Sequence, residues 1–454
     1  MDSPILEFVT GYYHSHPIRL HMPGHKGLQM MGVEHLDITE IPGADSLYEP
    51  EGIIKRSEEN ASQLFGCPTF YSTEGSSQCI RAMLHLIQLY GGRNTVIAAA
   101  RNVHKTFLSA VALLDLPVRW LYPKDEDSYL SCRLDSSELE DFLIQEKPTA
   151  LYLTSPDYLG NMADIALIAQ ICHRHQVLLA VDNAHGAYLR FLHPSLHPMS
   201  LGADICCASA HKTLPVLTGG AYLHISENAP MIMRDQAKNA LALFGSTSPS
   251  YLILQSLDMV NVYLVNGYRY LLKAQSQRVQ ALKERLIEHG YRLIGDEPMK
   301  ITICPKSYGY TGLELAEQLQ NQSVVCEYAD PDHVVLMISP ELGEVALQQA
   351  GDVLLSIPAQ ESILEGPPPF HRCRQEMSIR QATLSPGRTV PADHSLGMIL
   401  AAPSVGCPPA VPIAICGEEI DLAAIQRFRY YGIQNVTVVY KYRNPRNFPG
   451  RFGK

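Results

Sequence analysis

Between about residue 60 and residue 225 the sequence alternates apolar runs of strand length with segments of helical periodicity. This alternation limits the fold most, because strands separated by helices form a mostly parallel sheet covered on both faces. The helical segments include residues 77–90, which stop at Gly91-Gly92, and residues 165–175. The strand-like runs are 95–100, 150–154, 177–181 and 205–208. Ligands of such sheets bind beyond the carboxyl ends of the strands, so the residues after each run are the first candidates for chemistry.

The rest of the chain is predicted to form smaller units. A long helical stretch covers residues 251–289 and is broken near Asn266-Gly267. A helix at 313–321, a strand at 333–338 and a Pro-rich linker at 366–370 follow. We therefore expect an α/β protein with four parts, which are an N-terminal arm (1–30), a major domain (31–290), a small α/β domain (291–365) and a smaller α+β C-terminal domain (366–454).

Composition excludes several classes of protein. The formal net charge of -10 argues against a nucleic-acid binder, and the N-terminus lacks the basic and apolar regions of a signal peptide. Residues 398–416 are almost free of charge, but their four prolines prevent a single membrane-spanning helix, so we expect buried extended chain. The eleven cysteines show no metal-binding spacing. We therefore expect a cytoplasmic protein with free thiols and no metal site, whose partners are small molecules and copies of itself.

The segment Ser-Thr-Glu-Gly-Ser-Ser at residues 72–77 stands directly before a predicted helix. Gly75, Ser76 and Ser77 offer backbone N–H groups, hydroxyls and the positive end of the helix dipole, which together suit a phosphate. The alternative interpretation is that a serine here only caps the helix.

Three further candidates follow apolar runs. Asp182, in Val-Asp-Asn-Ala-His-Gly at 181–186, is suited to a metal, to base catalysis, to pairing with a protonated ring nitrogen, or to capping a loop. Lys212, in Ala-Ser-Ala-His-Lys-Thr at 208–213, leaves a buried strand, where its charge must be paired or removed. An imine accounts for that position, because desolvation favours the uncharged, nucleophilic amine. His104 follows the run 95–100; such a histidine is usually structural, but its imidazole can also stack on a flat ring.

Together these groups predict one ligand with a phosphate, an aldehyde and a basic ring nitrogen. Pyridoxal phosphate has all three, and it needs a lysine imine, a carboxylate that keeps the pyridine protonated, and a phosphate-binding cup. The sequence therefore predicts that residues 31–290 bind pyridoxal phosphate.

Several motifs resemble the bacterial ornithine/lysine/arginine decarboxylase family. They are His-Met-Pro-Gly-His-Lys-Gly at residues 21–27, Asp-Ile-Thr-Glu-Ile-Pro-Gly-Ala-Asp at 37–45, Pro-Glu-Gly-Ile-Ile at 50–54, Ser-Ala-His-Lys-Thr-Leu-Pro at 209–215 and Ser-Thr-Ser-Pro-Ser-Tyr at 246–251. The matches span residues 17 to about 257 in the family's order. The chain resembles the short members that lack an N-terminal wing domain.

The resemblance implies the aspartate-aminotransferase type of fold (fold type I) and a homodimer with active sites at the subunit interface. It also implies that Lys212 forms the Schiff base, that Asp182 pairs with the pyridine nitrogen, and that Lys212 or His211 returns a proton to the substrate's α-carbon. The implied cofactor contacts also include Ala184 and His104 on the two ring faces, Ser76, Ser77, Ser209 and His211 at the phosphate, Gly75 and His185, and Thr247 and Ser248 at the partner subunit's cofactor.

The C-terminal part departs from the family pattern at two positions. Ala402 replaces an acidic residue and Cys407 an aromatic one. If that acid normally meets a cationic side chain, the change affects the substrate. Asp157 is an additional acid that either compensates or is a solvated loop residue; the sequence slightly favours the solvated position.

The leading hypothesis for function is decarboxylation of arginine, lysine or ornithine, with arginine first and an amine of the polyamine pathway as product. Ala402 and Cys407 prompt a second hypothesis, a decarboxylase of an uncharged or acidic amino acid. A catalytically silent paralogue that regulates an active decarboxylase is a third, although Lys212, Asp182 and His104 are all intact. An aminotransferase shares the cofactor machinery, but the motif at 21–27 favours decarboxylation.

Overall fold

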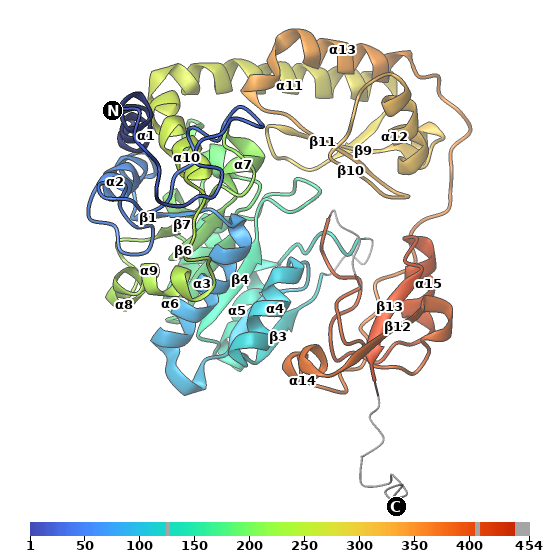
Figure 1. Cartoon of the computed structure of the whole chain (residues 1–454). Helices are drawn as coiled ribbons and strands as arrows, with labels where there is room; N and C mark the ends of the chain where they lie inside the picture. Colours follow the sequence, from blue (N-terminus) through green and yellow to red (C-terminus); the bar gives the residue numbers. More distant parts are fainter. Residues whose placement is uncertain (124–127, 405–408, 441–454) are drawn as a thin grey trace, which may run out of the picture.

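A seven-stranded sheet forms the centre of the computed structural model, which describes residues 1–123, 128–404 and 409–440 (Figure 1). Its order is β1-β7-β6-β5-β4-β2-β3, and β7 pairs antiparallel with both of its neighbours while the other pairs are parallel. The predicted mostly parallel α/β sheet is therefore confirmed. The strands are β1 (Thr69–Ser72), β2 (Ile97–Ala100), β3 (Val118–Leu121), β4 (Ala150–Thr154), β5 (Leu178–Asp182), β6 (Ile205–Ala208) and β7 (Ala221–Ile225).

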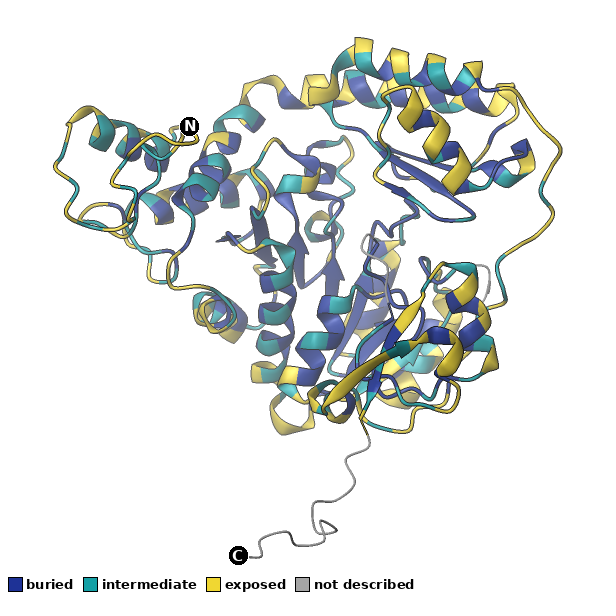
Figure 2. Cartoon of the chain, turned by 45° about the vertical axis from the view of Figure 1, so that its right-hand side comes forward, coloured by how far each residue is buried: buried dark blue, intermediate teal, exposed yellow. Residues whose placement is uncertain are grey.

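Helices cover the sheet on both faces, so that β2, β5, β6 and β7 are buried along their whole length (Figure 2). The structure has the predicted helices at 77–90 and 165–175 within one or two residues of the expected bounds. The surrounding helices are α2 (Ile53–Phe65), α3 (Gly75–Gly91), η1 (Gly92–Asn94), α4 (Lys105–Leu114), α5 (Ser136–Glu146), α6 (Ile165–Arg174), η2 (Ala187–Phe191), η3 (Pro198–Ser200), α7 (Ala210–Thr213), α8 (Met231–Asp235) and α9 (Ala237–Leu243).

The long helical stretch is interrupted where the sequence predicted. α10 (Tyr251–Tyr263) and α11 (Arg269–His289) flank η4 (Leu264–Tyr268), a π-helical segment. Within it Asn266 has φ −87° and ψ 60°, and Gly267 has φ +89°. Glycine adopts a positive φ without the steric cost that a Cβ brings, so Gly267 allows the two helices to meet at a kink.

A second, antiparallel sheet of order β10-β11-β9-β8 lies beside α11 and α13 (Figure 1). Apolar side chains around the first sheet and around the second sheet pack into one hydrophobic core. This core includes Ile5, Phe65, Leu315 and Leu354. The elements are β8 (Arg292–Ile294), β9 (Lys300–Cys304), η5 (Pro305–Tyr308), α12 (Gly312–Asn321), β10 (Tyr328–Ala329), β11 (Val334–Met337), η6 (Pro340–Leu342) and α13 (Gly343–Ser356).

Beyond α13 the described chain has no helix or strand until Ile379, which is consistent with a linker at 366–370. Phe370 nevertheless packs against Tyr122 and under the guanidinium of Arg427. The four domain boundaries themselves stay a prediction. The C-terminal elements are α14 (Ile379–Leu384), β12 (Gly387–Pro391), η7 (Ala392–His394), α15 (Leu422–Tyr430) and β13 (Asn435–Val439), with β12 and β13 antiparallel.

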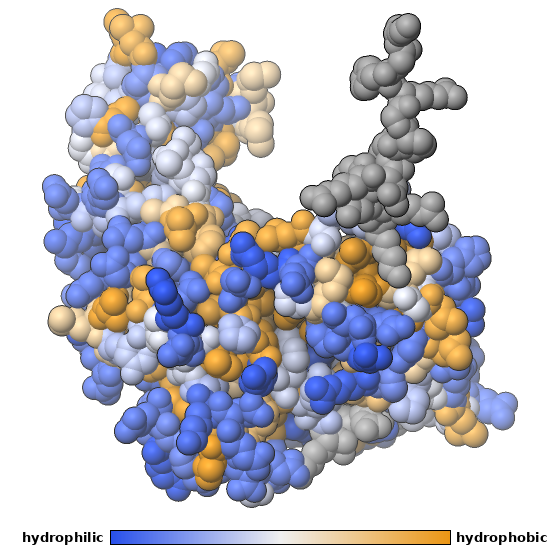
Figure 3. Space-filling view, turned by 90° about the horizontal axis from the view of Figure 1, so that it is seen from below, coloured by the Kyte–Doolittle hydropathy of each residue, from blue (hydrophilic) through white to orange (hydrophobic). Residues whose placement is uncertain are grey.

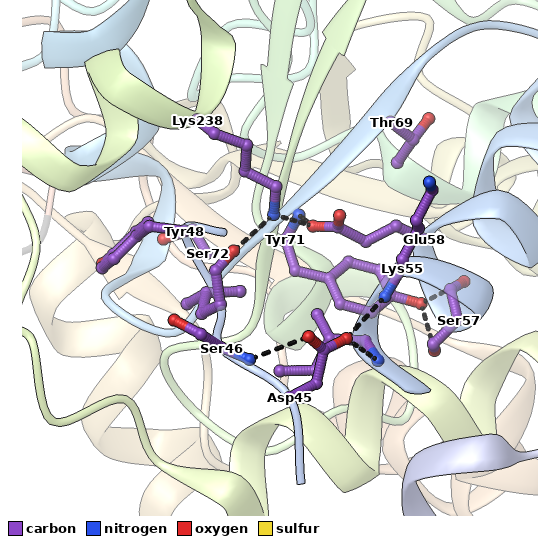
Figure 4. Close-up of polar contacts among 12 residues, drawn as sticks. Asp45, Ser46, Tyr48, Lys55, Ser57, Glu58, Thr69, Tyr71, Ser72 and Lys238 are labelled. Carbon is purple, nitrogen blue, oxygen red and sulfur yellow. Dashed lines mark hydrogen bonds and ion pairs between the residues drawn. The ribbon is translucent and has the colours of Figure 1, made fainter. Parts of the chain in front are cut away.

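The N-terminal segment follows α1 (Pro4–His14) as irregular chain and is anchored by Asp45 (Figure 4). The Asp45 carboxylate accepts hydrogen bonds from the backbone N–H groups of Ser46, Gly52 and Ile54, at 2.8–2.9 Å, at the start of α2. Burial alone would raise the pKa of Asp45, but these backbone donors hold it below its ordinary value. One acidic side chain therefore ties the expected family motif at 37–45 to the first turn of α2.

Seen from below, hydrophilic residues cover much of the surface, and apolar residues fill smaller areas between them (Figure 3). In the part of the chain that the structure describes, no helix is long and apolar enough to cross a membrane. Ten described cysteines are free thiols, seven of them buried and three half-buried. Residues 398–404 and 409–416 contain no helix and form isolated β-bridges, which agrees with the predicted extended chain.

Candidate active site

A cavity of about 320 Å³ opens at the carboxyl ends of β4, β5 and β6. Its position agrees with the rule that open α/β sheets bind ligands beyond their strand ends. Pro409 and Val411, from the C-terminal part of the chain, form another part of its wall. The sequence-predicted residues that line the cavity are Gly75, Ser76, Ser77, His104, Asp182, Ala184, His185, Ser209, His211 and Lys212.

Lys212 lies on α7, a short helix that begins directly after the buried strand β6. Its side chain turns toward the loop after β5, where Nζ lies 3.0 Å from Nε2 of His185. Unlike the strand before it, Lys212 is exposed in the single chain. The expectation that the amine is desolvated is therefore not met in the single chain.

Asp182 is the last residue of β5 and is buried. The Tyr152 hydroxyl, on the neighbouring strand β4, donates to Oδ2 at 3.1 Å, and the Ala184 N–H donates to Oδ1 at 3.2 Å. Burial raises the pKa of Tyr152 well above its ordinary value, so this hydroxyl keeps its proton and remains a donor. The carboxylate is thereby oriented at the cavity wall, as a partner for a protonated ring nitrogen requires.

His104 is the N-cap of α4, and its Nδ1 accepts a hydrogen bond from the Thr106 N–H at 3.2 Å. Desolvation lowers the pKa of His104 to about 4, so the imidazole is uncharged at neutral pH. An uncharged, flat ring fixed at its edge can stack on another ring in the cavity. The side chain thus has both a structural role and a free face.

The first turn of α3 carries Ser76 and Ser77 at the cavity. Ser209 Oγ donates to Ser76 Oγ at 2.9 Å, which joins this turn to the chain just before Lys212. Among the described residues no side chain caps α3, whose N-cap is Glu74, so neither serine has the capping role that the alternative interpretation required. The two hydroxyls and the helix N-terminus remain available to an anion.

Two glycines shape the turn beneath these serines. Gly75 has φ +72° and its N–H donates to the carbonyl of Gly219 at 2.7 Å. Gly219 has φ +103°, and a Cβ added there would lie 2.8 Å from the carbonyl oxygen of Thr73. A side chain at Gly219 would therefore push apart the segments that hold the helix N-terminus in place.

Thr247 and Ser248 do not line the cavity. Both are exposed in the loop before α10, where the Ser248 N–H donates to Ser246 Oγ at 3.1 Å. Their expected contact is with a partner subunit's cofactor, which a single chain does not test. That role stays a prediction.

Sequence reasoning missed Lys300, the first residue of β9, which is 3% exposed. Its Nζ donates to the carbonyl oxygens of Asp157 and Tyr158 at 3.1 and 3.4 Å and lies 3.1 Å from Nδ1 of His185. The available signal was a lysine beside an apolar strand, here at the first residue of the strand, whereas Lys212 follows its strand. Tyr158, which lines the cavity, was also missed.

The solvated position favoured for Asp157 is wrong. Its side chain is buried and accepts hydrogen bonds from the backbone N–H and the amide of Asn161, at 2.9 and 2.8 Å. Desolvation raises the pKa of Asp157. The residue closes the turn after β4 and is not a surface acid.

The two departures from the family pattern have different outcomes. Ala402 is half-buried, and its N–H donates to the Thr437 carbonyl at 3.4 Å. Cys407 lies outside the described residues. The neighbouring Glu418 is buried and forms an ion pair with Arg101 at 3.8 Å, so this acid holds the C-terminal part against the major sheet.

Two groups of potential metal ligands lie away from the cavity. His197, Cys206 and His224 form one group and Asp330, Asp332 and His333 the other, each with ligand atoms within 4.8 Å of one another. Neither group contains a residue that the sequence singled out, and the expectation that the chain has no metal site stays a prediction.

The residues at the cavity fit pyridoxal phosphate by their chemistry. Hydroxyls at a helix N-terminus suit its phosphate, Asp182 suits its ring nitrogen, His104 its ring face and Lys212 its aldehyde. The volume is also in the range of small-ligand pockets.

A model of the family described as "Orn/Lys/Arg decarboxylase, major domain" matches residues 3–294. The chain is 28% identical to the uncharacterized protein YaaO of Bacillus subtilis (strain 168), over 94% of each chain. It is also 28% identical to an arginine decarboxylase of that organism, over 92% of this chain and 91% of the relative. A lysine decarboxylase structure from Francisella novicida is similar with a TM-score of 0.77 at 16% identity, over 96% of this chain and 81% of that one. For the structure named "NIFS-LIKE PROTEIN" the TM-score is 0.55 at 13% identity, over 78% of this chain and 95% of that one.

Proposed function

The chain belongs to the Orn/Lys/Arg decarboxylase family, and from this membership we propose that it is a pyridoxal-phosphate-dependent decarboxylase of a basic amino acid. Its fold is that of fold-type I pyridoxal-phosphate enzymes, with the seven-stranded sheet and small antiparallel sheets. Members of this family and fold typically use pyridoxal phosphate. One observation carries the proposal: Lys212 and Asp182, thirty residues apart, line one cavity together with Ser76, Ser77 and His104.

In this proposal each residue of the cavity has a role that follows from its position. Pyridoxal phosphate, when bound, supplies the electron sink that takes up the charge left after loss of carbon dioxide. Lys212 Nζ would hold the cofactor at its aldehyde carbon, and it is the group that would return a proton to the substrate's α-carbon. Asp182, oriented by Tyr152 and the Ala184 N–H, holds the proton of the ring nitrogen.

His211 was the other candidate proton donor, and its surroundings favour a structural role. Its Nδ1 donates to the Gly220 carbonyl at 2.9 Å, which fixes the ring. Desolvation lowers the pKa of His211, so the imidazole is uncharged at neutral pH. We therefore assign proton return to Lys212.

The substrate proposal places arginine first, because the chain aligns along nearly its whole length with proteins named arginine decarboxylase. A second candidate, decarboxylation of an uncharged or acidic amino acid, has one observation in its favour. Apart from Asp182 and Glu74, the lining residues within the described ranges include no carboxylate to receive a cationic side chain. A carboxylate from a second subunit would remove this difficulty.

We also propose a homodimer that completes the site. Lys212 is exposed in the single chain although its function requires a shielded cavity. The N-terminal segment has apolar side chains that are exposed in irregular chain, as expected of an unpartnered interface. These side chains are Ile18, Leu20, Met22, Leu28, Met30, Met31 and Val33.

An absorbance spectrum of the purified protein, followed by a carbon-dioxide release assay with several amino acids, tests the proposal. We expect a visible band of lysine-bound cofactor that Lys212→Ala abolishes, and turnover of arginine, lysine or ornithine. Lys273→Ala, an exposed lysine on α11, is the matched control and should leave the band and the turnover unchanged.

Each of the other outcomes would support a different function or contradict the role of Lys212. Turnover of uncharged or acidic amino acids alone would support the second substrate candidate. A band without carbon-dioxide release would support a silent paralogue, or an aminotransferase if a keto acid forms. No band after addition of pyridoxal phosphate would contradict the role of Lys212.

A further inference from the structure

The His185 imidazole lies between two lysine amines. Its Nε2 is 3.0 Å from Nζ of Lys212, and its Nδ1 is 3.1 Å from Nζ of Lys300. His185 is buried in the cavity wall, and Lys300 comes from the second sheet, 115 residues along the chain. The three side chains therefore form a continuous row from the cavity to the interior.

Counting protons along this row restricts its charge. A neutral imidazole has one N–H and one lone pair, and an ammonium group has only donors. When Lys212 donates to Nε2, the proton of His185 is on Nδ1, and Lys300 must be an uncharged amine that accepts it. When Lys300 donates to Nδ1, the proton is on Nε2, and Lys212 must be the uncharged amine. Both hydrogen bonds exist together only if one of the two lysines is uncharged.

The surroundings of Lys300 accommodate both of its forms. The carbonyl oxygens of Asp157 and Tyr158 accept two hydrogens, which are the two that an uncharged amine carries. The third hydrogen of the ammonium form points to His185, and buried carboxylates lie near enough to stabilise its charge. The charged and titratable groups that act on Lys300 or His185 are Glu297, Asp157, Glu327, Lys212, His104 and His211.

We propose that Lys300 is a positioning residue that, through His185, accepts the proton of Lys212 and returns it. In the transfer, Lys212 Nζ gives a proton to His185 Nε2 while His185 Nδ1 gives its proton to Lys300 Nζ. The row carries one positive charge before and after, and no water or added base takes part. The inference deepens the proposed function and rests on it for the purpose of the transfer.

The transfer answers a difficulty at the cavity. Lys212 has to be uncharged to bond an aldehyde carbon and has to carry a proton to return one to the substrate. Burial does not shield this amine in the single chain, because Lys212 is exposed. A second amine connected through one imidazole supplies both protonation states without exchange with solvent.

Two shifts of pKa agree with the proton count. Desolvation, with the charges of Lys212 and Lys300, lowers the pKa of His185 well below its ordinary value, so the imidazole is neutral. Desolvation also lowers the pKa of Lys300, and the carboxylates of Glu297 and Asp157 oppose this shift. Burial therefore favours the uncharged amine of Lys300, while the two carboxylates favour its protonated form.

The test measures how fast Lys212 reacts with trinitrobenzenesulfonate in the full-length, cofactor-free chain, by peptide mass spectrometry between pH 6 and 9. An isolated lysine reacts about tenfold faster for each pH unit, because its uncharged fraction grows by that factor. We expect the natural chain to react at a nearly constant rate around neutral pH, because the row keeps a fixed fraction of Lys212 uncharged. Lys300→Met should restore the tenfold slope and lower the rate at pH 7 by at least about tenfold.

Two further variants separate proton transfer from charge alone. His185→Gln retains the Lys300 amine but breaks the row, so we expect the same slope as in Lys300→Met and no further change in the double variant. Lys300→Arg retains a permanent donor to Nδ1, which should leave Lys212 uncharged and its reaction independent of pH. The proposal is overturned if Lys300→Met or His185→Gln keeps the constant rate, or if Lys300→Arg regains the slope.

The measured reactivity of Lys212 does not depend on catalysis. If the chain bound no pyridoxal phosphate and decarboxylated nothing, the reactivity of Lys212 would still show whether the row exists. A measurement of each variant's thermal unfolding identifies any that fails to fold, and the remaining variants still decide between the outcomes.

Discussion

The Tyr152 hydroxyl donates a hydrogen bond of 3.1 Å to Oδ2 of Asp182 from the neighbouring strand. Both side chains are buried, so this hydrogen bond acts in a medium of low dielectric and orients the carboxylate strongly.

Tyr152→Phe removes only this donor. A hydrogen bond to a charged group contributes about 1.5–3 kcal/mol, and we expect its loss to lower the decarboxylation rate by about tenfold or more. Tyr222→Phe is the matched control, because the buried Tyr222 hydroxyl has no hydrogen-bond partner among the described residues. That control should keep full activity and unfold at an equal or higher temperature; an equal loss of activity in both variants would contradict the role of Tyr152.

Asp182→Asn replaces the carboxylate by a neutral amide of similar size. We expect the cofactor still to bind through Lys212 but decarboxylation to fall by at least about a hundredfold, because the neutral amide does not keep the ring nitrogen protonated. Absorbance and carbon-dioxide release measure the two effects separately. Asp141→Asn, on the exposed face of α5, should change neither. Unchanged turnover in Asp182→Asn would remove Asp182 from the mechanism.

Gly219→Ala should disturb the phosphate end of the cavity. The added Cβ meets the Thr73 carbonyl at 2.8 Å, and the residue already has φ +103°. We expect cofactor affinity, measured by titration with pyridoxal phosphate, to fall at least about tenfold. Gly267→Ala has the strain of a positive φ without a described atom within 4 Å; it should cost about 1–2 kcal/mol of stability and leave affinity unchanged. Equal affinity in both variants would show that this turn does not shape the site.

His197 makes stability fall as the pH falls. Its side chain is fully buried, and desolvation lowers its pKa to about 3. In the unfolded chain the pKa of His197 returns to about 6.5. Below that pH the unfolded chain therefore binds more protons than the folded chain, and this stabilises the unfolded state. The contribution is complete above pH 6.5 and diminishes toward pH 3; at pH 5 about 2 kcal/mol is lost.

His197→Phe tests this account, because Phe suits the contacts of the ring with Phe65 and His224. Urea unfolding measures the free energy of unfolding at pH 7 and at pH 5. The decrease of this free energy from pH 7 to pH 5 should be smaller by about 2 kcal/mol in His197→Phe than in the natural chain. His289→Asn, at the exposed end of α11, is the control and should leave the difference unchanged. An unchanged difference in His197→Phe would mean that His197 is already protonated in the folded state.

Much of the fold could be predicted because its signals are local. The bounds of β4 and β6 match the apolar runs, and the helix breaks at Asn266-Gly267, because periodicity and a glycine's allowed φ act within a few residues. Asp182 and Lys212 could be brought together for a related reason. The carboxyl ends of parallel strands share one edge of the sheet, so two residues that each follow a strand are neighbours there.

Burial and contacts between separate sheets could not be predicted in this way. Asp157 is buried although it follows a strand in a loop, and Lys212 is exposed although it leaves a buried strand. Lys300 reaches His185 from the second sheet, and Val411 reaches the same cavity from the C-terminal part. The sequence by itself determined the sheet and the residues at its strand ends, because these follow from local pattern, and the cofactor class was a prediction from those residues. Only the tertiary structure decided which distant segments cover those ends, because that depends on how separately folded surfaces pack together.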